Sequence, residues 1–130
     1  MATILLEGRG AIASLTVNDI ESSTRFYTEG LGFTVKQRDE EDGKVRFVML
    51  AAGSVELGLA QDDFAKGRNR SKGVGLRLWI ATRQPLEPLA AQLRAAGFPL
   101  ESDIAALPWG PKAFAVSDPD GFKFTISRDE

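Results

Sequence analysis

The sequence contains neither cysteine nor histidine. Without cysteine the chain cannot form a disulfide bond, a thiolate metal site or a cysteine nucleophile. Without histidine it lacks the commonest transition-metal ligand, the usual general base near neutral pH and any histidine-based catalytic triad. A zinc, nickel or iron site would have to be built from carboxylates and neutral oxygens, which suit those metals poorly. The composition therefore speaks against transition-metal chemistry before any motif is considered.

The chain also lacks a surplus of positive charge and a long apolar run. Its 16 basic and 18 acidic residues give a net charge of -2, whereas nucleic-acid binders depend on neutralising phosphates. No stretch approaches the roughly 20 apolar residues of a membrane span, and the opening MATILLEGRG does not have the pattern of a signal peptide. We therefore expect no nucleic-acid or membrane partner, one globular domain over residues 1–130, and the cytoplasm as the default location.

What the sequence does contain is one pattern written twice. In the first copy, Ala13, Leu15 and Val17 alternate with Ile12, Ser14 and Thr16, which is typical of a half-buried strand. Asn18 and Glu21 have the spacing of a helix capping box. The helix that follows is expected to end at Gly30 or Gly32, where a left-handed residue carries no Cβ penalty. Further strands are expected at 33–37, 45–50 and 55–59.

The second copy begins some sixty residues later. Leu76, Leu78 and Ile80 alternate with Arg77 and Trp79, which indicates another strand. We expect this strand at 75–81, a helix at 85–96 that ends at a second Gly-Phe pair, and strands at 99–103, 112–117 and 122–127. The chain is thus predicted to consist of a βαβββ module at 11–60, a linker at 61–73 and a second βαβββ module at 74–128.

Two such modules, with LTVNDIESSTRFYTEGLGF opening the first and FAVSDPDGFKFTI closing the second, resemble the vicinal oxygen chelate superfamily. This superfamily includes glyoxalase I, bleomycin-resistance proteins and extradiol dioxygenases. The resemblance covers about residues 11–128. It implies an α+β fold in which tandem βαβββ modules form curled mixed sheets around a cavity.

Metal-dependent members of the superfamily carry their ligands at four strand positions. By the motifs, these positions fall here at Ile12, Glu56, Gly75 and Thr125. Only Glu56 keeps a ligand-type side chain, whereas a catalytic divalent metal normally has three or four protein ligands. The resemblance is therefore closer to the metal-free, bleomycin-resistance-like branch, and it implies neither a metal nor another cofactor.

The candidate ligand-binding residues follow from this comparison and from strand alternation. Trp79 shares its strand face with Arg77, and Trp109 stands where the metal-free branch often places an aromatic residue at the cavity mouth. A tryptophan wall with a few charged groups suits a flat organic ligand, because rings stack and charges fix the orientation. The predicted ligand-binding residues are Ile12, Gly75, Arg77, Trp79, Trp109, Lys123 and Thr125.

Each of these residues also has a purely structural interpretation. Trp79 could fill the space that metal and substrate occupy in relatives, and Trp109 could pack at a dimer interface. Arg77, Lys123 and Glu56 could form one internal ion-pair network, since a charge that faces a partly dry cavity needs a partner.

Two functions from different classes follow. The first is a homodimeric, metal-independent protein that sequesters a small organic compound, as a resistance protein does. The alternative is a metal-independent isomerase or lyase of the same superfamily with Glu56 as its general base. Burial in an apolar cavity would raise the pKa of such a base toward neutrality, whereas a neighbouring Arg77 or Lys123 would lower it. The sequence leaves open whether the protein is an enzyme.

Overall fold

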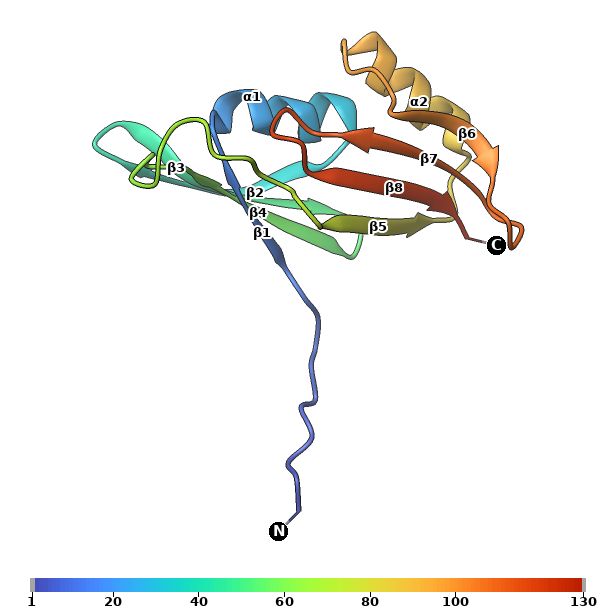
Figure 1. The fold of residues 1–130 in the computed structure, drawn as a ribbon, viewed down its shortest axis with the longest axis horizontal. Coiled ribbons are helices and arrows are strands. Elements are labelled where there is room, and N and C mark those ends of the chain that lie inside the picture. Colours follow the sequence, from blue (N-terminus) through green and yellow to red (C-terminus); the bar gives the residue numbers. More distant parts are fainter. Residues whose placement is uncertain (1, 130) are drawn as a thin grey trace.

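The computed structural model describes residues 2–129 and contains two four-stranded sheets (Figure 1). The elements in chain order are β1 (Ala13–Val17), α1 (Ile20–Arg25), the π-helical turn η1 (Phe26–Gly30), β2 (Thr34–Glu41), β3 (Lys44–Ala52), β4 (Val55–Gln61), β5 (Arg77–Thr82), α2 (Leu86–Ala95), β6 (Ser102–Ala106), β7 (Lys112–Ser117) and β8 (Lys123–Arg128). Within the described residues, no helix is long and apolar enough to cross a membrane.

Each sheet is built from four consecutive strands. The orders are β1-β4-β3-β2 and β5-β8-β7-β6. In both sheets the first and last strands pair in parallel and the other pairs are antiparallel. This repeated arrangement confirms the predicted α+β fold. The exact limits of the two modules and of the linker stay a prediction.

The helices lie on one side of the two sheets, and the opposite side carries no helix (Figure 1). We call these the helix side and the open face. Within residues 2–129 the sheets are not curled around an enclosed cavity, so that part of the expectation is wrong for the single chain. Each sheet has a helix on one face and no helix on the other.

The first helix begins one residue later than the capping pattern suggested. The N-cap is Asp19, whose carboxylate accepts the backbone N–H groups of Glu21 and Ser22, so the prediction of Asn18 as the cap is wrong. Spacing alone could not choose between two adjacent residues that both make good caps. The Asn18 side-chain oxygen instead accepts a hydrogen bond from the ammonium of Lys72 at 2.6 Å.

The fifth strand begins at Arg77, two residues after the predicted start. Gly73 and Gly75 both have left-handed backbone angles, with φ of +71° and +74°, which interrupt an extended strand. A Cβ atom at Gly73 would lie 2.5 Å from the carbonyl oxygen of Gly121. The loop that leads into β5 therefore lies directly against the turn between β7 and β8.

One hydrophobic core lies on the helix side and is shared by both halves of the chain. Phe26 of η1 packs edge to face on Phe98, which follows α2, with ring centroids 5.0 Å apart. Tyr27 packs in the same way on Phe124 of β8 at 5.6 Å. A Cβ atom at Gly30 would lie only 2.9 Å from the Leu93 side chain, so this glycine allows α2 to approach η1 closely. These contacts hold the two sheets together.

Polar contacts reinforce the same junction. The Tyr27 hydroxyl donates to the Asp118 carboxylate at 2.7 Å, and the backbone N–H groups of Asp120 and Phe122 donate to the other Asp118 oxygen. Asp120 accepts the backbone N–H of Asn18. Burial raises the pKa of Asp118, although the Tyr27 hydroxyl and the backbone N–H groups oppose the shift. Asp118 and Asp120 thus shape their turn and also fasten it to the start of the first helix.

Candidate functional site

Two tryptophans lie together on the open face of the β5–β8 sheet. Trp79 points away from the helices because its neighbours Leu78 and Ile80 pack on the helix side. Its indole N–H donates to the Ser127 hydroxyl at 2.8 Å. The Trp109 ring is 5.8 Å from the Trp79 ring, tilted by 32°. With Trp79 and Trp109 exposed by 50% and 65%, the pair presents a large aromatic surface to solvent.

The loop between β6 and β7 holds Trp109 in place. The Leu107 N–H donates to the Pro111 carbonyl at 2.7 Å, and the Gly110 N–H donates to the Leu107 carbonyl at 2.9 Å. Gly110 has φ of +119°, which favours glycine at this turn. Prolines at 108 and 111 further restrict the backbone. The ring is therefore presented by a stiff loop.

A charged network lies on the same face, beside the tryptophans. Glu101 accepts a hydrogen bond from Arg77 at 3.2 Å, lies 3.8 Å from the Lys123 ammonium, and accepts the Ser117 hydroxyl at 2.8 Å. Arg77 also donates to the Thr125 hydroxyl at 3.1 Å. The Ser117 hydrogen bond, with Arg77 and Lys123 nearby, lowers the pKa of Glu101. One carboxylate therefore meets two cations, which leaves one positive charge in excess.

Small side chains make up the centre of this face. Ala115 pairs with Thr125, and Ala113 pairs with Ser127, across β7 and β8. All four are buried, although this sheet face carries no helix. Arg77 and Trp79 extend across β8 and donate to the Thr125 and Ser127 hydroxyls. The open-face residues of this centre are Ala81, Ala113, Ala115, Thr125 and Ser127. The open face of this sheet therefore combines a centre of small side chains with an exposed aromatic pair and a charged network.

The structure brings most of the predicted site residues together. Five of the seven predicted ligand-binding residues share this open face or its rim, namely Arg77, Trp79, Trp109, Lys123 and Thr125. Gly75 lies outside the strand but lines a hollow of about 460 Å³ with Arg77 and Lys123. Ile12 belongs to the other half of the chain, where it precedes β1 and is exposed.

Glu56 lies apart from this group. It sits in β4, on the other sheet, with its carboxylate 3.6 Å from the Lys36 ammonium. The ion pairs of Arg77 and Lys123 are made with Glu101, so the network with Glu56 that the sequence left open does not form. Sequence reasoning missed Glu101 because it precedes a weakly patterned strand. Ser127 could have been found, since it has the same strand parity as Thr125.

The open face of the β1–β4 sheet is covered by one of its own side chains. The Phe47 ring lies over Gly58, where an added Cβ atom would be 2.8 Å from the ring. Phe47 and Gly58 belong to neighbouring strands, since β3 pairs with β4. The centre of this face is therefore already occupied by an aromatic ring from the chain itself.

The comparison with known proteins agrees with the fold. A family model described as the Glyoxalase/Bleomycin resistance protein/Dioxygenase superfamily matches residues 10–126. The chain belongs to this superfamily. A search of curated proteins finds no match.

Solved structures share the fold over most of their length. TioX from Micromonospora sp. ML1 is 17% identical with a TM-score of 0.76, over 93% of this chain and 98% of TioX. A glyoxalase-related enzyme from Fulvimarina pelagi is 26% identical with a TM-score of 0.73, over 93% of this chain and 88% of that one. A superfamily member from Sphaerobacter thermophilus is 24% identical with a TM-score of 0.74, over 96% of this chain and 100% of that one. The first and third likenesses establish the fold alone.

The four metal-ligand positions of the superfamily do not fit a divalent metal in this chain. Ile12 and Gly75 offer no side-chain donor atom. The Thr125 hydroxyl is a neutral oxygen that already accepts a hydrogen bond from Arg77. The Glu56 carboxylate lies beside the Lys36 ammonium. Among residues 2–129, no three histidine, cysteine, aspartate or glutamate side chains are grouped as metal ligands. A catalytic site with three or four protein ligands cannot be assembled from this set.

Proposed function

We propose that this superfamily member is a small-molecule binding protein that sequesters a flat aromatic compound on the open face of the β5–β8 sheet. The observation that carries the proposal is the half-exposed pair of Trp79 and Trp109 beside a floor of small side chains. Large exposed apolar surfaces mark ligand or protein interfaces. Aromatic faces bind other rings by stacking, and the nearby charged network would orient the ligand.

In this proposal, binding requires no metal ion. The support is chemical: only one carboxylate stands at the four ligand positions, and Lys36 lies beside it. The residues that would contact the ligand, Arg77, Trp79 and Trp109, act through stacking and hydrogen bonding. Ligand affinity should therefore be the same before and after dialysis against a chelator.

A homodimer would complete the binding site. No helix covers either open face, and sheet edges that lack a neighbour favour association with a second chain. The extended segment before β1 lies on the same side and exposes Ile4, Leu5 and Leu6 (Figure 1). A second copy over the open face would bury this surface and enclose the ligand. Light scattering at tens of micromolar and native mass spectrometry should report two chains, and a stable monomer would contradict this part of the proposal.

The alternative function, a metal-independent isomerase or lyase, would use Glu56 as general base. Glu56 and the tryptophan pair lie on different sheets, so within one chain the base and the stacking surface are separated. We therefore favour binding. The two functions differ in stoichiometry, because a sequestering protein protects its ligand and an enzyme yields product in excess of itself.

The experiment is a fluorescence titration of wild type, Trp79→Ala and Glu56→Gln with a panel of planar aromatic compounds. Stacking on an indole contributes about 1 kcal/mol beyond the buried area. With that area included, Trp79→Ala should weaken binding by about tenfold or more. Trp109 remains as the fluorescent reporter, since its ring centroid lies 5.8 Å from that of Trp79 in the wild type. Glu56→Gln is the control, since it keeps its shape on the other sheet.

Two results would contradict the proposal. Unchanged affinity in Trp79→Ala would show that the ligand lies elsewhere. Turnover of a bound compound that disappears in Glu56→Gln, while binding persists, would establish the enzyme instead, because a general base acts mainly in the transition state.

A further inference from the structure

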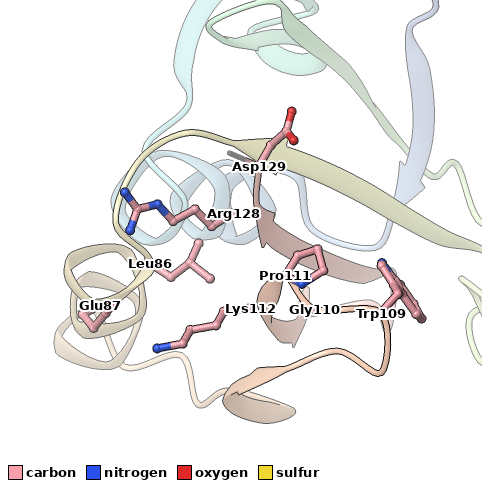
Figure 2. Close-up of a pocket in the computed structure, with 8 residues that line it drawn as sticks. All are labelled: Leu86, Glu87, Trp109, Gly110, Pro111, Lys112, Arg128 and Asp129. Carbon is pink, nitrogen blue, oxygen red and sulfur yellow. The ribbon is translucent and has the colours of Figure 1, made fainter.

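A pocket of about 550 Å³ lies on the helix side, where β7 begins and β8 ends (Figure 2). Its volume is in the range of small-molecule sites. It faces the first turn of α2 and is lined by Leu86, Glu87, Trp109, Gly110, Pro111, Lys112, Arg128 and Asp129. Apart from Trp109, it shares no residue with the open-face site.

Two cations stand opposite each other in this pocket. Because β7 and β8 are antiparallel and Ala113 pairs with Ser127, Lys112 and Arg128 are the next facing residues. Figure 2 shows both side chains extending toward α2, on either side of Leu86. Like charges directly opposite each other destabilise a sheet. Both side chains are exposed, so solvent screens part of this repulsion, and an anion held between them would relieve the rest.

The described part of the chain supplies no such group. None of its ion pairs within 4.0 Å includes Lys112 or Arg128. The acidic residues of the pocket are Glu87 and Asp129, and neither comes within that distance of the two cations. The Asp129 carboxylate is turned away from both (Figure 2).

Besides its four charged residues, the pocket is lined by apolar side chains and Gly110. Leu86 is fully buried at its floor, and Pro111 and Trp109 form one wall. The Asp129 N–H donates to the Thr82 carbonyl at 2.6 Å, and the Leu107 N–H donates to the Pro111 carbonyl. These bonds fix the backbone on two sides, so the cavity exists before any ligand binds and little ordering is required.

We propose that this pocket is a second binding site, and that it takes a small organic carboxylate. The carboxylate would bridge Lys112 and Arg128, and the apolar body of the ligand would pack on Leu86, Pro111 and the near edge of Trp109. Charge-assisted hydrogen bonds are about twice as strong as neutral ones, and an arginine can hold a carboxylate through two of them. The two cations that would hold the carboxylate do not belong to the open-face site, and Trp109 borders both sites.

The test is an NMR titration of backbone amides with 2-naphthoate, compared with its neutral analogue 2-naphthylmethanol. We expect 2-naphthoate to shift the amides of Leu86, Gly110, Lys112 and Arg128. Its affinity should fall at least tenfold in the double variant Lys112→Gln/Arg128→Gln, and the neutral analogue should bind wild type at least tenfold more weakly. Binding should also weaken with added salt.

Two controls separate this proposal from general charge effects and from the open-face site. Lys66→Gln removes an exposed cation in the linker, which does not line the pocket. The affinity of this variant for 2-naphthoate should stay within twofold of the wild-type affinity. Trp79→Ala should leave the shifts at Lys112 and Arg128 unchanged even if it abolishes open-face binding. The double variant should melt no lower than wild type, because it relieves the repulsion between the two strands.

The proposal is overturned if the double variant retains wild-type affinity within twofold. It is equally overturned if 2-naphthoate shifts only the amides around Trp79 and Ser127, or if the neutral analogue binds as tightly as the carboxylate.

Discussion

The two sides of the sheets are built on opposite principles. On the helix side, Phe26, Tyr27 and Leu93 have no measurable exposure, and in the described residues every buried side-chain polar atom has a hydrogen-bond partner. On the open face, Trp79 and Trp109 are at least half exposed. Successive residues of a strand point to opposite sides of the sheet. A substitution at one residue should therefore affect stability, and one at the next residue should affect binding.

The two open faces also differ, although the sheets have the same strand order. Phe47 covers Gly58 at the centre of one, whereas alanines and hydroxyl residues form the centre of the other. On the β1–β4 sheet an aromatic ring of the chain itself therefore lies at the centre of the open face. On the β5–β8 sheet the aromatic rings lie at the rim instead. This difference is the reason why we propose the β5–β8 sheet, and not the β1–β4 sheet, as the ligand-binding face.

The largest effect should come from the helix side. Leu93→Ala removes a fully buried side chain that packs on Gly30, and it should lower the free energy of unfolding by about 2–5 kcal/mol. Affinity for an open-face ligand should be unchanged. Leu76→Ala is the matched control, since this leucine is partly exposed and its loss should cost less than about 1 kcal/mol. Urea unfolding measures the free energy of both variants. Similar losses in Leu93→Ala and Leu76→Ala would contradict the assignment of the core to the helix side.

A smaller effect is expected at the junction between the two halves. Tyr27→Phe removes the hydroxyl that donates to Asp118 and leaves a buried carboxylate oxygen without its partner. The expected loss is about 1–3 kcal/mol at pH 7. Urea unfolding at pH 7 provides the measurement, and a loss below the error of the method would show that solvent replaces the hydroxyl.

The same variant has a predictable pH dependence. Asp118 has a raised pKa, so its contribution to stability is full below the unfolded value of 3.8 and is lost as pH rises through the folded value. Losing the Tyr27 hydrogen bond raises the pKa of Asp118 further, because that bond stabilises the ionised form. The deficit of Tyr27→Phe relative to wild type should therefore be smaller at pH 4 than at pH 7. An equal deficit at both values would contradict this assignment.

The smallest effect on stability should come from the open face. Glu101→Gln weakens a partly exposed ion-pair network and should change the unfolding free energy by about 0.5 kcal/mol or less. Because the substitution frees Arg77 and Lys123, the affinity of the open face for a planar carboxylate should increase severalfold. An NMR titration that follows the backbone amides of Trp79 and Ser127 measures this affinity. Weaker binding would show instead that Glu101 itself holds the ligand.

The pH dependence of this network has the opposite sign. The pKa of Glu101 is lowered, so the stability it contributes is present above the unfolded carboxyl value and is lost as pH falls through the lower folded value. Glu101→Gln should remove that acid-side loss. Melting temperatures of wild type and Glu101→Gln, followed from pH 6 downward, should converge.

Much of the fold could be predicted because its signals are local. Alternation placed Arg77 and Trp79 on one face of a strand, and the glycine stops marked the helix ends. The misses have physical causes. Gly75 was assigned to a strand that its left-handed backbone excludes. Glu101 was missed because it precedes β6, whose pairing with β7 contains a register irregularity that breaks simple parity.

The candidate site was harder to predict than the fold. The resemblance to the superfamily supplied positions such as Ile12 and Glu56, but these belong to the other half of the chain, Ile12 just before β1 and Glu56 in β4. Whether two sheets share one cavity depends on how they are placed relative to each other and to a second chain. No local pattern in Leu15 to Val17 or in Leu78 to Ile80 carries that information.

The assembly of each sheet from consecutive strands also bears on how the molecule reaches its native state. Pairings such as Ala13 with Leu57 and Arg77 with Lys123 close loops within one half of the chain. Contacts of much greater sequence separation, such as Tyr27 with Asp118 and Asn18 with Asp120, form only when the halves dock. Loop closure costs more entropy as the loop lengthens, so we expect each sheet to form first and docking to come last in folding.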